Sequence, residues 1–319
     1  MFRKLMLSSA LLAATAVAAL AQTYPNRPIR VVVPFTAGSG TDIVARTVME
    51  QVSQQIGQPI VVENRGGAAG TIGIGSVARA EPDGYTLLIQ STSFAVTATT
   101  YTNPGYDHRK DLAGITALVS LPNVLVVAPN KYKDVKALVA HIKANAGKLN
   151  YASGGAGSAA HLNGERFRLA TGIQIQHLPF KGGPEGLASV MSGDSAFYFI
   201  PLPAARGLID GGRLAALAVS GSMRSGSLPN VPTTIESGFP NSEYDFWVGF
   251  WAPAKTPRAI VDRLNAETVK ALANPSVKEK LARIGGDPLP MKPADFDKFV
   301  NKEIDINATL VKAAGVKIN

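Results

Sequence analysis

The stretch Val31–Arg46 reads VVVPFTAGSGTDIVAR, and its pattern decides the fold of this part of the chain. The β-branched block at its start is typical of a buried strand, and apolar residues recur at helical spacing from Ile43 to Ile56. Small and hydroxylic residues form the turn between them. A strand that passes through such a turn into a helix directs backbone N–H groups and the positive end of the helix dipole at one point in space. The sequence therefore predicts an anion-binding loop.

The N-terminal segment has the pattern of a secretory signal peptide. Arg3 and Lys4 precede an apolar run that ends in an Ala-Leu-Ala sequence at Ala21. We therefore expect residues 1–21 to be a signal peptide that is removed after Ala21, with export to the periplasm. The apolar run is short for a bilayer span and no second hydrophobic segment follows, which disfavours a membrane anchor.

Composition narrows the class of protein. Without the expected signal peptide about 300 residues remain, enough for one large domain or two ordinary ones. There is no cysteine, which excludes disulfides, thiolate metal sites and a cysteine nucleophile, and the four histidines are dispersed, so we expect no zinc site. The formal net charge is +9, but no basic run is interleaved with aromatic residues. The charge favours small anionic molecules over nucleic acid as partners.

Strand and helix patterns alternate along the chain, which indicates parallel α/β sheets. A first series begins with the strand pattern IRVVV, and a second begins with NVLVVAPN and repeats the same plan. We predict two α/β units with chain crossings near Pro122–Val124 and Tyr244–Trp247. The corresponding domains are 22–122 together with 246–319, and 123–245.

Each unit contains one loop of the kind described above, namely Phe35–Asp42 and Ser153–His161. Ligands of open α/β sheets bind beyond the carboxyl ends of the strands, so two facing sheets would place both loops in one cleft. Both loops are almost free of charge. Amides, hydroxyls and helix N-termini can satisfy carboxylate oxygens without a buried cation. A purely structural alternative is that each loop's serine and the residue three positions later only cap a helix.

Six motifs, in order, give the chain a resemblance to a known family. They are YPNRPIRVVVPFTAGSGTDIVAR, VVENRGGAAGTIGIGSVARAEPDGYTLL, KLNYASGGAGSAAHLNGERF, HLPFKGGPEGLASVMSGD, GGRLAALAVSGSMRSGSLPNVPTTIESG and FWAPAKTPRAIVDRLN. Together they resemble the extracytoplasmic solute receptors of the tripartite tricarboxylate transporter family, the Bug receptors. The resemblance implies an α/β, two-domain type II periplasmic binding protein fold, a clamshell in which each domain is a mostly parallel sheet with flanking helices.

The resemblance also implies a function and its partners. The protein would capture an organic carboxylate, as a monomer without cofactor, metal or nucleic acid, and deliver it to the permease subunits of a tripartite tricarboxylate-type transporter. The two loops would grip one carboxylate, and the segments after the third strand and after HLPFKG would line the rest of the cleft. The expected ligand-binding residues are Phe35, Thr36, Ala37, Gly38, Ser39, Thr41, Asp42, Ser91, Thr92, Ser93, Ser153, Gly154, Gly157, Ser158, His161, Phe180, Lys181, Tyr198 and Phe199.

The chain departs from the family pattern at the expected site. The first loop has Gly38-Ser39-Gly40 where relatives commonly carry a double glycine, and Phe199-Ile200 stands where many relatives have Phe-Asp. The second change replaces a polar strand end by an apolar one. These differences favour an aromatic or bulkier acid over citrate, and di- and tricarboxylates stay open as ligands. Tyr198, Phe199 and Phe246 are candidates for a stacking surface, with core packing as the alternative.

The sequence also bears on two other functions. An enzyme would need catalytic motifs, but the chain has no G-x-S-x-G elbow, no P-loop lysine, and a Gly38-Ser39-Gly40 sequence that lacks the third glycine of a dinucleotide fingerprint. His161 and Glu165 are spaced i,i+4, which fits an acid/base pair or half a metal site, but equally a helix surface contact. We expect no catalytic residue. A receptor that presents its ligand to a sensor kinase is the remaining alternative.

Overall fold

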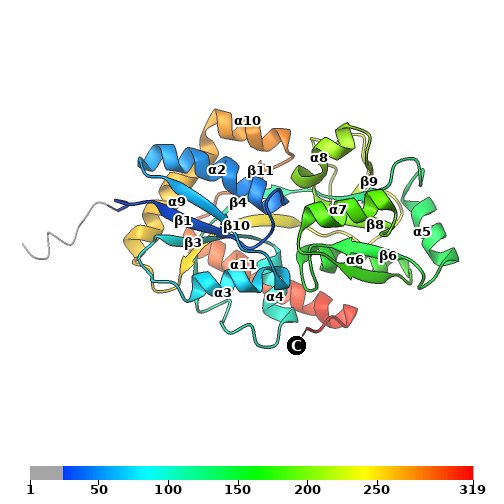
Figure 1. The fold of residues 1–319 in the computed structure, drawn as a ribbon, viewed down its shortest axis with the longest axis horizontal. Coiled ribbons are helices and arrows are strands. Elements are labelled where there is room, and N and C mark those ends of the chain that lie inside the picture. The colour runs from blue at the N-terminus through cyan, green and yellow to red at the C-terminus, as the bar shows by residue number, and fades with distance from the viewer. Residues whose placement is uncertain (1–23, 319) are drawn as a thin grey trace, which may run out of the picture.

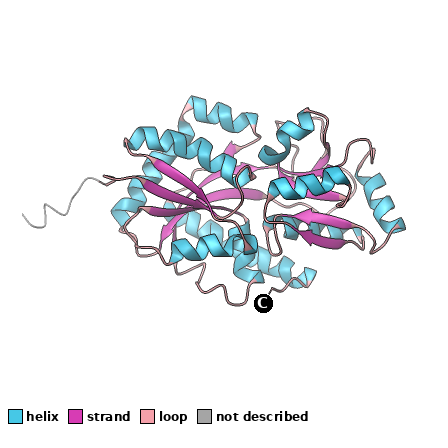
Figure 2. Ribbon diagram, viewed as in Figure 1, coloured by secondary structure: helices cyan, strands magenta, loops and turns pink. Residues whose placement is uncertain are grey.

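The chain folds into two units, each a sheet with flanking helices, which lie side by side (Figure 1, Figure 2). The computed structural model describes residues 24–318, so the expected signal peptide and its cleavage point lie outside the described residues. Within this range, no helix combines the length and the apolar character needed to cross a bilayer.

The first unit contains a six-stranded sheet in the order β11-β4-β10-β3-β1-β2. Its strands are β1 (Ile29–Val33), β2 (Ile60–Asn64), β3 (Thr86–Ser91), β4 (Leu112–Leu121), β10 (Phe246–Pro253) and β11 (Asp287–Pro288). Its helices are α2 (Gly40–Ile56), the 3-10 turn η1 (Ala68–Gly70), α3 (Thr71–Ala78), α4 (Ser93–Thr100), α9 (Arg258–Ala273), α10 (Pro275–Arg283) and α11 (Pro293–Ala314).

The second unit contains a five-stranded sheet in the order β7-β6-β8-β5-β9. Its strands are β5 (Asn123–Val127), β6 (Asn150–Ser153), β7 (Gln176–Pro179), β8 (Phe197–Pro201) and β9 (Ala215–Val219). Its helices are α5 (Val135–Ala144), α6 (Ala159–Thr171), α7 (Gly183–Ser192) and α8 (Leu202–Asp210).

Most strands of each sheet run in one direction, as expected. β1 lies parallel to β2 and β3, and β6 lies parallel to β7 and β8. The exceptions include β5 and β10, which are antiparallel to both of their neighbours. Both β5 and β10 begin at the point where the chain crosses from one unit into the sheet of the other. Such a strand starts at the edge facing the other unit and must run away from it, whereas the parallel strands end there.

The residues on either side of the expected crossings belong to different sheets. β4 ends at Leu121 and β5 begins at Asn123, while β10 begins at Phe246. The domain borders themselves stay a prediction. The two crossings lie side by side, because Phe246 at the start of β10 pairs with Leu121 at the end of β4. Next to them, Thr92 after β3 exchanges hydrogen bonds with Trp247 in β10, at 2.9 Å in each direction.

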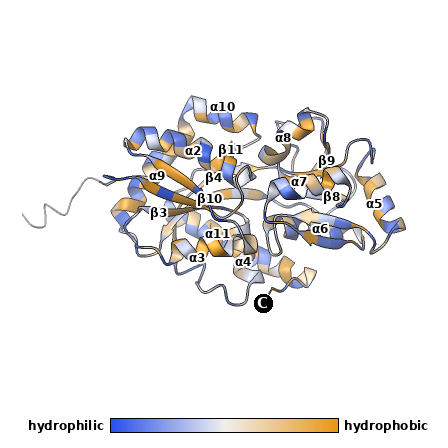
Figure 3. Cartoon of the chain, in the orientation of Figure 1, coloured by the Kyte–Doolittle hydropathy of each residue, from blue (hydrophilic) through white to orange (hydrophobic). Residues whose placement is uncertain are grey.

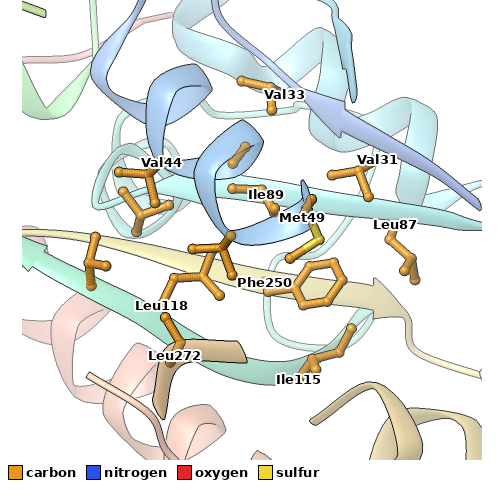
Figure 4. Packing of buried hydrophobic residues seen from close by; sticks show 14 of the residues in the cluster. Val31, Val33, Val44, Met49, Leu87, Ile89, Ile115, Leu118, Phe250 and Leu272 are labelled. Atoms are coloured by element: carbon orange, nitrogen blue, oxygen red, sulfur yellow. The ribbon is translucent and has the colours of Figure 1, made fainter. Parts of the chain in front are cut away.

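The opening stretch forms the strand, turn and helix that its pattern predicts. Val31 and Val33 of β1 pack with Val44 and Met49 of α2 in the main core, which also holds Phe250 of β10 (Figure 4). Hydrophobic residues gather on the strands, and the helices present mixed faces (Figure 3). Burying one face of α2 against the sheet fixes its N-terminus at the carboxyl end of β1, and this packing positions the first loop.

The two units also share packed surface. Ala159 and Leu162 of α6, in the second unit, belong to the same buried cluster as Val311 of α11, in the first. Beyond α11, the backbone of Ile318 exchanges hydrogen bonds with Thr100 and Thr102, at 2.9 and 3.3 Å. The C-terminal segment therefore lies beside α4, next to the N-terminal end of α6 (Figure 1).

Candidate functional site

The first loop is shaped by a buried carboxylate. Gly38 takes a left-handed conformation with φ of 78°, and its N–H donates to Oδ2 of Asp42 at 2.9 Å. Asp42 also accepts hydrogen bonds from Asn64 at 2.9 Å and from Arg46 at 3.0 Å. Oγ of Ser39 accepts the N–H of Asp42 at 3.3 Å and caps α2. The hydrogen bonds of Asp42 therefore hold the bend of the loop at Gly38 and attach it to α2 and to the end of β2.

The second loop repeats this arrangement with a histidine. Gly157 has φ of 77°, and its N–H donates to Nδ1 of His161 at 3.0 Å. Oγ of Ser158 accepts the N–H of His161 at 3.2 Å and caps α6. At the start of the loop, Ser153 forms a 2.6 Å hydrogen bond with Nε2 of His177. The rings of His161 and His177 stack with their centroids 3.8 Å apart.

The environment of the two histidines keeps both rings neutral. Burial lowers the pKa of His161 to about 4, and the nearby Arg168 contributes in the same direction. Burial also lowers the pKa of His177 to about 3, and the adjacent His161 adds to this effect. An Nδ1 atom that accepts a hydrogen bond carries no proton, so the neutral ring of His161 is protonated on Nε2.

The N-terminal ends of α2 and α6 face the same small cavity, which we call the inner chamber. First-turn N–H groups have no partner within a helix, and both helices direct such groups here. Thr41 is 3% exposed, and its hydroxyl makes no hydrogen bond to any residue of the described range. The volume is about 40 Å³, room for a few waters or one carboxylate. The lining residues are Phe35, Ser39, Gly40, Thr41, Ser91, Ser93, Gly154, Ser158, Ala160, Gly183, Ile200, Pro201 and Phe246.

The inner chamber is closed by contacts between the two units. The N–H of Ala159 donates to Oγ of Ser93 at 2.9 Å, which links the start of α6 to the start of α4. Oγ of Ser93 also accepts a hydrogen bond from Ser91 at 3.2 Å. Gly40 lies so close to Pro201 that an added Cβ would stand 2.7 Å from its Cβ. The structure therefore represents a closed arrangement of the units.

A larger cavity of about 390 Å³, which we call the vestibule, lies next to the inner chamber. Phe35 and Gly154 line both cavities, so they mark the boundary between them. Across the rim, the hydroxyl of Tyr101 donates to the backbone oxygen of Ala156 at 3.1 Å. The remaining lining residues are Gly67, Ala68, Ala69, Gly70, Gly155, Pro179, Phe180, Lys181 and Glu185.

The structure brings part of the expected ligand set to these cavities. The inner chamber collects Phe35, Ser39, Thr41, Ser91, Ser93, Gly154 and Ser158, and the vestibule adds Phe180 and Lys181.

The other expected residues lie behind the cavities or at their rim. Asp42, Gly157 and His161 form hydrogen bonds within the loops. Ser153 bonds to His177 of β7, and Thr92 bonds to Trp247. Thr36 packs on Gly182, and Ala37 and Gly38 form the exposed bend. Tyr198 and Phe199 are buried in two different core clusters.

Several lining residues were missed by sequence reasoning. Gly183 belongs to the quoted motif HLPFKGGPEG, and Gly67–Gly70 belong to VVENRGGAAG, so glycine-rich breaks in both motifs were the available signal. Within the second segment, Ala68 and Ala69 adopt φ of 47° and 53°, a region that side chains disfavour. No comparable signal marked Tyr101, which reaches the vestibule from the end of α4.

The site is suited to binding an anion through neutral groups. The inner chamber is lined by hydroxyls, glycines and apolar side chains, without a charged residue. The charged residues that line the vestibule are Lys181 and Glu185. Among residues 24–318, no group of three or more His, Asp or Glu side chains is placed to hold a metal ion.

Two sheets joined by two crossings, with paired helix N-termini at a closed cleft, define a two-domain binding protein of the periplasmic type. The model of the tripartite tricarboxylate transporter family receptor matches residues 44–316. The chain belongs to this family, which confirms the resemblance seen in the sequence.

Relatives match over nearly the whole chain. Protein BugT of Bordetella pertussis is 36% identical over 301 residues, covering 93% of this chain and 92% of BugT. The R. palustris protein Rpa4515, solved with adipate, has a TM-score of 0.89 and 32% identity, covering 92% of this chain and 99% of its own. MatC from Rhodopseudomonas palustris, solved with bound malate, has a TM-score of 0.85 and 28% identity, covering 90% of this chain and 100% of its own.

Proposed function

We propose that this chain is an extracytoplasmic receptor that captures an organic carboxylate for the permease subunits of a tripartite tricarboxylate-type transporter. The observation that carries the proposal is the inner chamber, an uncharged space lined by the N-termini of α2 and α6 and by Thr41, whose hydroxyl makes no hydrogen bond within the described residues. Membership of the receptor family and the relatives solved with adipate and malate support it.

The chemistry of the inner chamber favours a carboxylate over a cation or a neutral group. Helix N-termini attract negative charge, and hydrogen bonds from fixed N–H and O–H groups to a carboxylate are stronger than those to neutral acceptors. Because the chamber holds no arginine or lysine, an outgoing ligand leaves no unpaired cation behind. These properties suit reversible capture.

The sizes of the two cavities favour an elongated ligand. A chamber of about 40 Å³ holds little more than the carboxylate, so the body of the ligand extends past Phe35 into the 390 Å³ vestibule. Phe35 and Phe180 offer apolar faces there, and Lys181 offers a cation. An aromatic acid would use the apolar faces, and a di- or tricarboxylate would place a second carboxylate near Lys181.

The same site gives no support to catalysis. The ionisable side chains of the loops are Asp42 and His161, and each accepts a hydrogen bond from a glycine N–H of its own loop. The two side chains also belong to different units. General acid/base chemistry needs a positioned pair within reach of the reacting atom. We propose that the protein acts as a non-catalytic monomer in the periplasm.

A binding panel tests the proposal. Residues 22–319 would be titrated with adipate, malate and benzoate, with adipamide, malamide and benzamide as matched neutral controls. We expect at least one acid to raise the melting temperature, because ligand at 100 times its dissociation constant adds about 2.7 kcal/mol of stability. The matching amide should give no shift. Equal binding of acid and amide, or no binding by any acid of the panel, would contradict the proposal.

A further inference from the structure

The two loops are built on one plan and differ in one acceptor. In each, a glycine with φ near 78° precedes a capping serine, and the glycine N–H donates to the side chain four residues later. The acceptor is the carboxylate of Asp42 in the first loop and Nδ1 of His161 in the second. A carboxylate oxygen has several lone pairs, whereas Nδ1 has only one.

The second loop is also held at its other end by a histidine. Ser153 bonds to His177 at 2.6 Å, and Oγ of Ser153 also accepts the N–H of Gly155 at 3.1 Å. Because the rings of His161 and His177 stack at 3.8 Å, each fixes the plane of the other. Both ends of the loop that carries Gly154 and Ser158 to the inner chamber therefore depend on this ring pair.

We propose that His161 is a positioning residue of the ligand site, whose Nδ1 lone pair fixes the backbone of Gly157 and thereby aims the start of α6 at the ligand. His161 contributes no atom to the lining of either cavity and acts through Gly157. The proposal rests on the proposed function wherever affinity for a carboxylate is measured. The NMR measurement of the His161 ring does not depend on it.

Protonation of His161 would remove the interaction that the proposal requires. A proton on Nδ1 turns the acceptor into a donor that faces the N–H of Gly157, so the loop would have to move. The groups around the ring are Tyr151 from β6, His177 from β7, and Glu165 and Arg168 from α6. Glu165 is already engaged, since it accepts the hydroxyl of Tyr151 at 2.7 Å and pairs with Arg168 at 2.7 Å. The cluster therefore offers an incoming proton no free carboxylate.

Matched substitutions of His161 test the proposal. The amide oxygen of asparagine can occupy the position of Nδ1 without titrating, whereas the amide of glutamine reaches one bond too far. With adipate, malate and benzoate as probes, we expect His161→Asn to bind within about threefold of the wild type at pH 7. His161→Gln and His161→Leu should both lose about tenfold or more. Equal affinity for all four proteins would overturn the proposal.

A pH series separates positioning from a packing role. The ratio of wild-type to His161→Asn affinity cancels the titration of the probe itself. This ratio should stay constant from pH 8 to pH 5.5 and fall towards pH 4, where the wild-type ring gains its proton. A ratio that stays constant to pH 4 would overturn the proposal, because a purely structural ring predicts no such change.

A measurement without ligand tests the positioning role of His161 separately from the proposed carboxylate binding. Nitrogen-15 NMR of the imidazole in wild-type protein should show His161 with an unprotonated Nδ1 at pH 7, and the Gly157 amide should shift as that signal is lost in acid. A protonated Nδ1 at pH 7 overturns the positioning role whether or not any acid binds. A correct tautomer without binding by any acid would count against the proposed function instead.

Discussion

Gly40 and Pro201 meet across the closed cleft, with space for no more than the hydrogen atoms of Gly40. A Cβ placed on Gly40 would stand 2.7 Å from Cβ of Pro201 and 3.2 Å from its Cγ. The first belongs to the N-terminus of α2 and the second ends β8, so the contact joins the two units directly. The closed arrangement therefore depends on a glycine at the start of α2.

Gly40→Ala should hinder closure without unfolding the protein. The methyl group costs about 1–3 kcal/mol only when the units are closed, so ligand affinity should fall roughly tenfold. Isothermal titration with the best acid of the panel measures the loss. Gly207→Ala is the matched control, because a Cβ there meets no atom within 4 Å. If Gly40→Ala bound the acid as tightly as the wild type does, the contact between Gly40 and Pro201 would play no part in binding.

Ligand should draw the two units together. A ligand that touches loops of both units favours the closed state by its difference in affinity for the two states. Because the sequence has no cysteine, Val61→Cys and Leu169→Cys would give two unique labelling sites, both exposed and one in each unit. Electron-electron distance measurements should show a broad or longer distance without ligand and a shorter, narrower one with it. A distribution of label distances that is unchanged by ligand would contradict the clamshell mechanism.

Thr41→Val should separate binding from stability. The valine keeps the shape of threonine but removes the hydroxyl, which has no partner in the described structure. Loss of one hydrogen bond to the carboxylate should cost about 1 kcal/mol, roughly fivefold in dissociation constant. Chemical denaturation of the ligand-free protein should show unchanged or increased stability, since no bond is lost there. Thr41→Ser retains the hydroxyl and should bind within about twofold of the wild type.

Acid should destabilise the ligand-free fold through its buried histidines. Burial lowers the pKa of His108 to about 4, and its Nε2 lies 3.0 Å from Oγ1 of Thr97. Between the ordinary pKa of about 6.5 and this value, the unfolded chain binds protons that the folded chain does not. Stability is therefore complete above pH 6.5 and falls towards pH 4, by about 1.4 kcal/mol per pH unit for each such histidine.

Urea denaturation between pH 7.5 and 4.5 measures this slope. His108→Gln should show a shallower slope than the wild type, because it removes the buried ring that the unfolded chain protonates first. Parallel curves for the wild type and His108→Gln would rule out the assignment.

Local pattern was enough to predict the two loops, because each combines a strand, a turn and a capped helix within a short stretch. The alternation of side chains along a strand also bears on the expected stacking surface. Side chains of successive strand residues point to opposite faces, so Tyr198 and Phe199 cannot both face the cleft. In the structure, Tyr198 packs with Ile200, which lines the inner chamber, and Phe199 packs with Phe167 in the other cluster.

Other parts of the site depend on contacts between distant segments. Tyr101 reaches the vestibule because α4 ends at the rim and an isolated β-bridge pairs Tyr101 with Ile318 near the C-terminus. The role of His161 follows from its distance to Gly157 and from the stacking of His177, which comes from another strand. Spacing alone showed a capping pattern and a possible pair with Glu165, but not which atom of the ring was engaged.

Oγ1 of Thr36 is buried against Gly182 across the cleft without a hydrogen-bond partner, and a Cβ on Gly182 would lie 1.9 Å from it. When the units separate, this hydroxyl would regain water, so shutting the empty cleft removes a polar group from solvent at a cost of about 1–3 kcal/mol. That cost is the same for every cargo. It acts as a threshold, because a solute that binds too weakly to offset this cost leaves the units open, and the ligand-free protein favours the open arrangement.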